Sequence, residues 1–258
     1  MTKFDGYVSR WISDDETQAQ MGGLFWANDG TSSGVTSKHD AVSESDSSLR
    51  KQAGGAEKSL VCFLPGSQIV TPRGEIAIEK LRAGDRVFTR DNGLQQIRWI
   101  GQTIVSGEEL SNTQALAPVR IRQGALGNNT PDRDLIVSPN HRVLLLSDIA
   151  MMMFDENEIL VEAKHLVGLH GIERVSVPSA HYIHLMLDHH EVILANGVWS
   201  ESFQPTEASI NGLSDAEKAE LLSLFPSLAH ETGIQAFASA RRALKGHEAK
   251  TFVAGFKL

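Results

Sequence analysis

From residue 60 onward, the chain is a succession of short runs rich in β-branched residues. Polar turns separate them, among them Asp91-Asn92-Gly93, Gly127-Asn128-Asn129 and Asn196-Gly197. Many short strands joined by such turns are typical of an all-β domain. At 41% hydrophobic residues, the chain can supply the core that such a domain needs. The predicted strands cover residues 68–71, 75–78, 86–90, 94–100, 119–122, 134–137, 142–146, 159–161, 173–177, 181–187 and 191–194.

The N-terminal part of the chain has a different composition. Residues 1–59 are rich in Ser, Gly, Asp, Glu and Thr and show no sustained periodicity, and such segments cannot bury enough apolar surface to fold. We therefore predict a flexible polar segment over residues 1–59, with a linker over residues 28–59. Aromatic islands, such as Trp11 and Trp26, interrupt it. Two interpretations of these islands stay open, a recognition tag and the remnants of a disordered arm.

Helical signals replace the strand pattern after Pro205. Ser214 and Glu217 form a capping box, and apolar residues follow it before Pro226, so a short amphipathic helix is predicted there. A second helix is predicted over residues 231–244. The chain thus divides into the N-terminal segment, an all-β domain over residues 60–205 and a short C-terminal helical extension over residues 206–258.

The charge and hydropathy of the chain argue against two classes of partner. With a net charge of -8 and scattered Lys and Arg, the sequence has no basic surface for nucleic acid. No run has the length of a membrane span, and the N-terminus lacks the apolar core of a signal peptide. We therefore expect no nucleic acid and no membrane as partner. A cytoplasmic location and secretion without a signal both stay open.

Three short blocks stand out within the predicted β domain. The first, VCFLPGS, holds Cys62, the only cysteine of the chain, and continues into SQIVTPRGEIAIEKLRAGDRVF. The second, VSPNHRV, contains Ser138 and His141, and the third, HLMLDHHEVILANG, begins at His184. In this order the blocks resemble the Hint (Hedgehog/intein) superfamily, and in particular bacterial standalone Hint domains. The resemblance implies an all-β Hint fold with pseudo-two-fold symmetry.

The resemblance also implies a reaction. In Hint proteins a cysteine at the first position of the domain attacks the peptide bond before it, which here makes Cys62 the nucleophile on the carbonyl carbon of Val61. Ser138 and His141 match the Thr-x-x-His block of the family, with Ser in place of Thr. His141 is then expected to bond the amide nitrogen between Val61 and Cys62 and to act as general acid, with Ser138 bonding the same region. An imidazole suits this role because its pKa lies near neutrality.

The third block adds an auxiliary group. His184 stands where many inteins carry a catalytic aspartate, and if the strand continued to residue 190, Asp188 and His190 would share its face. The neighbouring histidines raise a zinc hypothesis, but the spacing of His181 and His184 places them on opposite faces of a strand. A single cysteine also excludes a multi-cysteine zinc site and an intramolecular disulfide. No metal and no other cofactor is predicted.

Two departures from the family narrow the reaction. Splicing inteins end in His-Asn, whereas Glu201 and Ser202 stand at those positions and Phe203 follows them. Neither cyclisation nor transfer to a second acceptor is therefore expected. Residues 99–103 contain no aspartate that could activate a sterol, as in Hedgehog proteins. The prediction is a single-turnover release of residues 1–61, in which the N-terminal segment is the cis-substrate and water or an external nucleophile opens the thioester.

Two other functions stay open. An inactive Hint scaffold could serve as a binding or structural module, and finding His184 and Glu201 outside hydrogen-bond reach of Cys62 would favour it. A trans-acting cysteine protease that uses Cys62 and His141 would need an open peptide groove beside the cysteine. A lone buried cysteine is most often a small apolar residue, so it is the surrounding blocks that favour a nucleophile.

Overall fold

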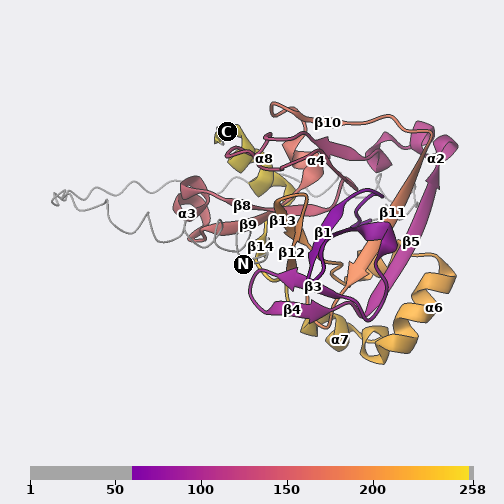
Figure 1. Cartoon of the computed structure of the whole chain (residues 1–258). Helices are drawn as coiled ribbons and strands as arrows, with labels where there is room; N and C mark the ends of the chain where they lie inside the picture. The colour runs from indigo at the N-terminus through magenta and orange to yellow at the C-terminus, as the bar shows by residue number, and fades with distance from the viewer. Residues whose placement is uncertain (1–59, 256–258) are drawn as a thin grey trace, which may run out of the picture. The chain divides into compact units, whose positions relative to one another are not determined.

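The computed structural model describes residues 60–255, from Leu60 to Gly255 (Figure 1). The predicted polar segment over residues 1–59, its aromatic islands included, lies outside the described residues, as do residues 256–258. Among the described residues, no helix combines the length and the apolar character that crossing a membrane requires.

The largest sheet of the described region has nine strands. Its main order is β14-β9-β8-β13-β12-β1-β2, and β3 and β4 join it through β12. All pairs are antiparallel except β9 and β14. The prediction of many short strands is confirmed for this sheet. Its strands are β1 (Gln68–Thr71), β2 (Gly74–Ala77), β3 (Arg86–Thr89), β4 (Gly93–Gln96), β8 (Arg142–Leu146), β9 (Glu158–Glu162), β12 (Val192–Ala195), β13 (Val198–Glu201) and β14 (Arg242–Ala243).

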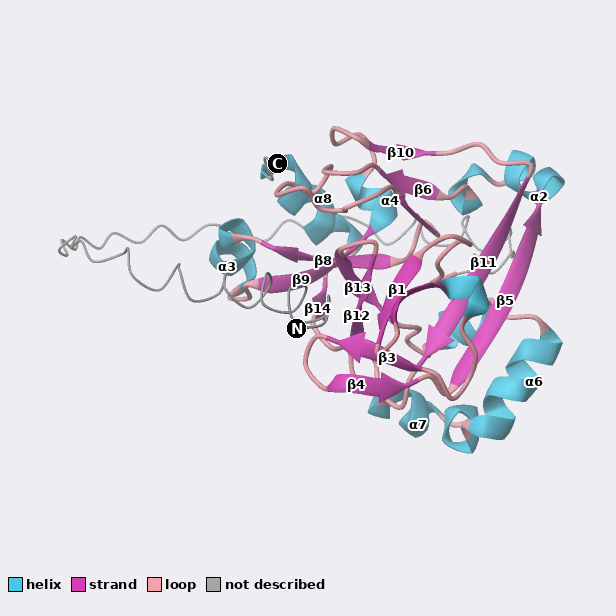
Figure 2. Cartoon of the chain, in the orientation of Figure 1, coloured by secondary structure: helices cyan, strands magenta, loops and turns pink. Residues whose placement is uncertain are grey.

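Two smaller sets of strands lie beside the segment that contains Cys62: the sheet β10-β6-β7 and the two-stranded ribbon β11-β5. Phe63 bridges Val137 of β7 and Ile183 of β11, so the segment that contains Cys62 joins the two sets. The long strands β5 and β11 run side by side (Figure 2), with His184 opposite Gly101. The strands are β5 (Trp99–Ser106), β6 (Val119–Ile121), β7 (Leu135–Val137), β10 (Ile172–Arg174) and β11 (Ser179–Met186).

Helices occupy the connections and the C-terminal part. The predicted capping box is present, since the Ser214 side chain accepts a hydrogen bond from Glu217 N at the start of α6. This helix lies against β5 (Figure 2). The helices are α2 (Gly107–Asn112), α3 (Asp148–Phe154), α4 (Ala163–Leu166), α5 (Glu207–Asn211), α6 (Asp215–Leu224), α7 (Glu231–Ala236) and α8 (Gly246–Gly255), with short 3₁₀ turns η1 (Ile78–Lys80), η2 (Gln114–Leu116) and η3 (Pro226–Ala229).

Some predicted boundaries are wrong. The run over residues 94–100 belongs to two strands, β4 and β5. The sequence did not predict β13 or the helices α2, α3, α4, α5 and α8. Short apolar runs do not distinguish strand from helix by periodicity. The helix predicted over residues 231–244 ends at Ala236, and Arg242 and Ala243 pair with the edge of β9 instead. There the backbone hydrogen bonds to β9 outweigh helix propensity, which is a weak preference.

The backbone around Cys62 is extended, and its side chains pack into three apolar clusters. Because successive side chains of an extended segment point in opposite directions, Leu60, Cys62 and Leu64 enter one cluster. Phe63 enters the main core, and Val61 enters a third cluster that is formed largely by the C-terminal helices. The peptide bond between Val61 and Cys62 is therefore held where these clusters meet.

Candidate active site

Cys62 is held like a residue of a buried strand. Backbone hydrogen bonds tie Phe63 N to Ile183 O at 3.0 Å and Ser138 N to Cys62 O at 2.9 Å. The segment therefore has partners on both sides, from β11 and from the end of β7. Cys62 is fully buried, with 0% of its surface exposed, so its backbone and its thiol are fixed inside the domain.

The Ser138 side chain forms two hydrogen bonds with the backbone around the peptide bond that precedes Cys62. Its hydroxyl oxygen accepts a hydrogen bond from Cys62 N at 2.9 Å and donates one to Leu60 O at 2.7 Å. The prediction that His141 bonds this amide nitrogen is therefore wrong for the described arrangement. Ser138 directly follows β7, and its backbone N donates a hydrogen bond to Cys62 O. This position brings its short side chain next to Cys62 N. The prediction that Ser138 contacts this region agrees with the geometry.

The His184 side chain lies within hydrogen-bond distance of the thiol. Its Nδ1 lies 3.2 Å from Cys62 Sγ and 3.0 Å from Val61 O, while its Nε2 lies 3.5 Å from Sγ and 3.3 Å from Thr103 Oγ1. The carbonyl of Val61 can only accept a hydrogen bond, so Nδ1 carries the proton that is donated to it. In this tautomer Nε2 has a free lone pair that can receive the thiol proton.

Aromatic side chains fix the plane of the His184 ring. Trp99 stacks on it with ring centroids 5.9 Å apart, and Phe203 contacts it edge-on at 5.1 Å. The imidazole is thus packed as well as hydrogen-bonded, and it has little freedom to turn away from the Val61 carbonyl. Phe203, whose side chain cannot serve as a second acyl acceptor, therefore packs against the ring.

His141 lies in the core beside the site without a polar partner. It is 1% exposed and packs edge-on against Phe63, with ring centroids 4.3 Å apart. Neither of its ring nitrogens has a hydrogen-bond partner among the described residues. Leaving a buried polar group unpaired costs about 1–3 kcal/mol. An imidazole retained at that cost calls for an explanation outside stability, and a proton-carrying role is one.

Burial keeps the reacting groups neutral. It raises the pKa of the Cys62 thiol well above its ordinary value, which the hydrogen bond with Ser138 only partly offsets, and the charges of Glu217 and Glu201 raise it further. Burial also lowers the pKa of His184 to about 4, although the contact with the Val61 carbonyl and the charge of Glu217 act in the opposite direction. At neutral pH a protonated thiol therefore faces a neutral imidazole.

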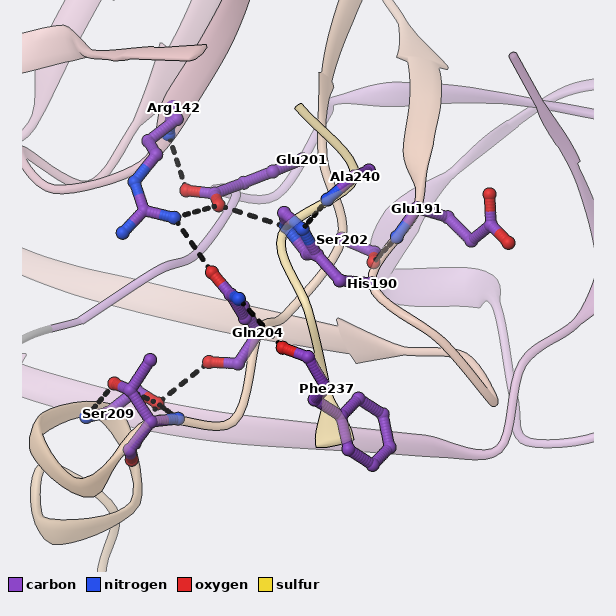
Figure 3. A network of polar contacts seen from close by, with 10 residues as sticks. Arg142, His190, Glu191, Glu201, Ser202, Gln204, Ser209, Phe237 and Ala240 are labelled. Atoms are coloured by element: carbon purple, nitrogen blue, oxygen red, sulfur yellow. Dashed lines mark hydrogen bonds and ion pairs between the residues drawn. The ribbon is translucent and has the colours of Figure 1, made fainter. Parts of the chain in front are cut away.

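A buried polar network is built around Glu201 (Figure 3). Glu201 accepts hydrogen bonds from Arg142 N at 2.7 Å and from His190 Nε2 at 3.1 Å. Ala240 N donates to His190 Nδ1, so the proton of this ring sits on Nε2. Burial alone would raise the pKa of Glu201, but Arg142 and His190 outweigh it and hold that pKa below its usual range.

The prediction that Asp188 and His190 share a strand face with His184 is wrong. The strand ends at Met186, so Asp188 and His190 do not continue the face of His184. Asp188 is exposed and pairs with Arg98, and His190 belongs to the Glu201 network. The described residues contain no group of His, Cys, Asp and Glu able to hold a metal ion.

Thr103 is the site residue that sequence analysis missed. Residues 99–103 contain no aspartate, and a threonine in a strand has no motif of its own. The pairing of β5 with β11 could have pointed to it, since Thr103 faces Tyr182 and so lies diagonally across from His184.

Acid should destabilise the fold because the two active-site histidines are buried neutral. Burial lowers the pKa of His141, like that of His184, to about 4 from 6.5. Unfolding then takes up protons between these values, so their contribution to the free energy of unfolding is full above pH 6.5 and is lost as the pH falls to 4. The size is on the order of 3 kcal/mol for each ring.

Urea unfolding between pH 7 and pH 4 would measure this loss in the Cys62→Ala chain, which cannot cleave through the thiol. A second substitution, His141→Leu, should flatten the decline because one titrating ring is gone. A decline of unchanged size in the double variant would contradict the assignment of a low pKa to His141.

Known proteins resemble this chain over the same region. A family model described as the Hint domain matches residues 61–207, more than half of the 258-residue chain. Among solved structures, a bacterial intein-like domain from Clostridium thermocellum is 15% identical, with a TM-score of 0.37, over 56% of this chain and 100% of that one. The gp41-1 intein is 14% identical, with a TM-score of 0.32, over 54% and 96%. A DnaB intein from Synechocystis sp. is 12% identical, with a TM-score of 0.35, over 55% and 98%. No curated protein matches.

Proposed function

The chain belongs to the Hint domain family, because the model of that family matches more than half of it, and from this premise we propose that it cleaves its own backbone between Val61 and Cys62. The predicted family and all-β Hint fold are confirmed by this match. In the proposal, the segment released is residues 1–61, and residues 62–258 keep the domain and the helices that follow it.

One observation supports the proposal: a single imidazole contacts both the attacking sulfur atom and the carbonyl oxygen on which negative charge would develop. His184 Nδ1 lies 3.0 Å from Val61 O, and the same ring lies within 3.5 Å of Cys62 Sγ through either nitrogen. A general base must be within hydrogen-bond reach of the proton that it removes. An oxyanion donor must lie next to the oxygen on which charge develops. His184 is placed for both tasks.

The first step is an N-to-S acyl shift. His184 removes the thiol proton at Nε2 while Cys62 Sγ attacks the carbonyl carbon of Val61. As the S–C bond forms, negative charge gathers on Val61 O and is stabilised by the Nδ1 proton of His184. The C–N bond then breaks, and the proton taken from sulfur ends on Cys62 N, which becomes a free amine. Atoms and charge balance, because the peptide isomerises to a thioester.

The turn between β7 and β8 supplies the two side chains, Ser138 and His141, that we assign to the leaving nitrogen. Ser138 holds Cys62 N at 2.9 Å before the reaction, and this contact keeps the amide plane in a fixed orientation. We assign delivery of the proton to His141, because a neutral imidazole can accept a proton on one nitrogen and release it from the other. Both of its nitrogens are free of protein partners among the described residues.

The second step opens the thioester. Water adds to the Val61 carbonyl carbon, the C–S bond breaks, and the products are a carboxylic acid at residue 61 and the restored thiol of Cys62. An external thiol or amine can take the place of water. The test is an intact-mass time course of the purified full chain, with and without added thiol, which should convert the 258-residue chain into two fragments.

One observation favours the alternative of an inactive scaffold. Glu201 binds Arg142 and His190, and no hydrogen bond joins it to Cys62. His184, in contrast, lies within reach of the thiol, so only one of the two conditions for the scaffold is met. A parent chain that stays intact with and without thiol, although correctly folded, would establish the scaffold instead.

The reaction should yield two products only, because the C-terminal side of the domain has no group free to cyclise. Two asparagines near that side precede a glycine, Asn196 and Asn211. Asn211 is held in helix α5, where its Oδ1 accepts a hydrogen bond from Lys218 Nζ, and the side-chain amide of Asn196 is hydrogen-bonded at both its oxygen and its nitrogen. Its Oδ1 accepts from Gln68 N at 2.6 Å, and its Nδ2 donates to Asp134 O at 2.8 Å. Intact mass should therefore show residues 1–61 and 62–258. A further product that begins at Gly197 or Phe203 would contradict this prediction.

A further inference from the structure

A carboxylate from the C-terminal helices lies near His184 and is linked to it through Thr103. Glu217 on α6 accepts a hydrogen bond from Gln102 N at 2.8 Å. Its two oxygens lie 3.5 Å and 3.4 Å from Thr103 Oγ1, which in turn lies 3.3 Å from His184 Nε2. A continuous polar path therefore runs from Glu217 through Thr103 to the imidazole that contacts Cys62.

The Glu217 carboxylate is fixed in place from its own helix. In the capping box of α6, its Oε2 accepts from Ser214 N at 3.0 Å and from Ser214 Oγ at 2.7 Å. Among the described residues it forms no ion pair. The charge of Glu217 is thus held near β5 without a basic side chain to neutralise it.

The strand opposite the carboxylate is shaped to admit it. A Cβ atom added to Gly101 would lie 2.3 Å from the Trp99 ring and 3.1 Å from Glu217 Oε1. Real Cβ atoms do not approach so closely, so the absence of a side chain at residue 101 allows both Trp99 and Glu217 to occupy their positions. Trp99 also donates to Glu220 Oε2 at 3.2 Å, which is a second polar contact between β5 and α6.

We propose that Glu217 is a positioning residue for the cleavage reaction and that, through Thr103, it holds His184 and stabilises the imidazolium that forms when His184 takes the thiol proton. The inference rests on the proposed function. Glu217 lies outside the residues matched by the family model, 61–207, so the helical extension would complete the active site.

The hydrogen bonds that link Glu217, Thr103 and His184 can adapt when His184 becomes protonated. In the resting state the Thr103 hydroxyl donates to Glu217, and His184 Nε2 has a lone pair. Once Nε2 is protonated it donates to Thr103 Oγ1, which continues to donate to Glu217. The buried cation then has a carboxylate at the end of its hydrogen-bond path, and a buried charge without such compensation is costly. The Thr103 contacts are long in the resting chain and would shorten as charge develops.

The charged and titratable groups around His184 are few. Cys62 faces it from the extended segment, His141 from the turn after β7, and Glu217 from α6. Cys62 and His141 are neutral at pH 7, because burial raises the pKa of the first and lowers that of the second. Glu217 is the group whose negative charge raises the pKa of His184.

The test compares four single variants of the full chain. Glu217→Gln keeps an oxygen acceptor for Gln102 N and for the cap but removes the charge, and Thr103→Val removes the hydroxyl while keeping the shape. Each should slow cleavage by about tenfold to a hundredfold, the effect of one hydrogen bond to a charged group. Thr103→Ser restores the hydroxyl and should cleave near the parental rate. Asp215→Asn removes an exposed charge from the first turn of the same helix and leaves Glu217 and its contacts unchanged, so it should also cleave near the parental rate.

Two further readouts separate positioning from a merely structural effect. Combining Glu217→Gln with Thr103→Val should slow cleavage no more than the slower single variant, because both break one path. The acid limb of the rate profile should also move to lower pH in Glu217→Gln, because His184 loses the charge that raises its pKa. Multiplied effects in the double variant, or an unmoved acid limb, would overturn the inference.

A measurement without cleavage keeps the inference distinguishable from the proposed function. In the Cys62→Ala chain, an NMR titration of the His184 ring should give a lower pKa when Glu217→Gln is added. If the parent chain does not cleave but this pKa shifts, the positioning contact stands and the proposed function falls. If the parent cleaves and Glu217→Gln changes neither the rate nor the His184 pKa, only the positioning role is wrong.

Discussion

The Cys62→Ala chain should remain intact under conditions in which the parent chain releases residues 1–61. The acyl shift needs a nucleophile on the Val61 carbonyl carbon, and a methyl group cannot provide one. Because Cys62 is the only cysteine, no neighbouring thiol can replace it. Intact-mass spectrometry after purification and after incubation with added thiol is the measurement, and the expected loss is complete within detection.

The control for this variant is its stability. Removing a single buried sulfur atom deletes little volume, so the free energy of unfolding should fall by about 1 kcal/mol, at the low end of core truncations. A urea titration can check that the chain is still folded. Recovery of a fragment that begins at residue 62 from the folded alanine variant would show that cleavage does not use the thiol, and the proposed function would be wrong.

A trans-acting protease fits the geometry less well than cis cleavage. The nucleophile of a protease must face a groove that an external peptide can enter. Here Cys62 is fully buried, and its flanking backbone occupies the strand-like position between Ile183 of β11 and Ile136 of β7 through hydrogen bonds of 3.0 Å and 3.2 Å. The chain's own peptide bond therefore lies where an external substrate would have to bind.

The sequence blocks predicted a large part of the site. Cys62, Ser138 and His184 come from segments far apart in the chain, and the structure brings them into contact. These residues sit in or next to strands, where the pairing of the fold decides the position. Their joint appearance in three ordered blocks therefore carried the spatial information that no single block contains.

The remaining contacts were beyond a sequence argument. Whether Ser138 or His141 accepts the hydrogen bond from Cys62 N depends on the conformation of the tight turn after β7. Residue type does not specify that conformation. Glu217 carries an obvious capping-box signal, but that signal concerns its own helix. Its approach to Thr103 depends on how α6 packs on β5, and this packing is set by scattered apolar residues that have no spacing in common.

The last prediction concerns the two buried imidazoles, and it separates their roles. His184→Gln should slow cleavage by on the order of 10³-fold or more, because it removes the base, worth on the order of 10²–10⁴, while a side-chain amide can still donate to the Val61 carbonyl. His141→Ala should slow it by on the order of 10²–10⁴ if His141 carries the proton to the leaving nitrogen. The rates can be read from intact-mass time courses of the full chain. His189→Ala is the matched control, because His189 is exposed and lies outside the site.

The two substitutions differ in what they leave behind. In His141→Ala the thiol still has its base, so added thiol should not restore the rate, because the blocked event is departure of the amine. In His184→Gln the site keeps a hydrogen-bond donor for the Val61 carbonyl, so raising the pH to ionise the thiol directly should recover part of the rate. Parental cleavage by His141→Ala would return that ring to a packing role against Phe63. A His184→Gln chain that cleaves at the parental rate at neutral pH would remove the one contact on which the mechanism depends.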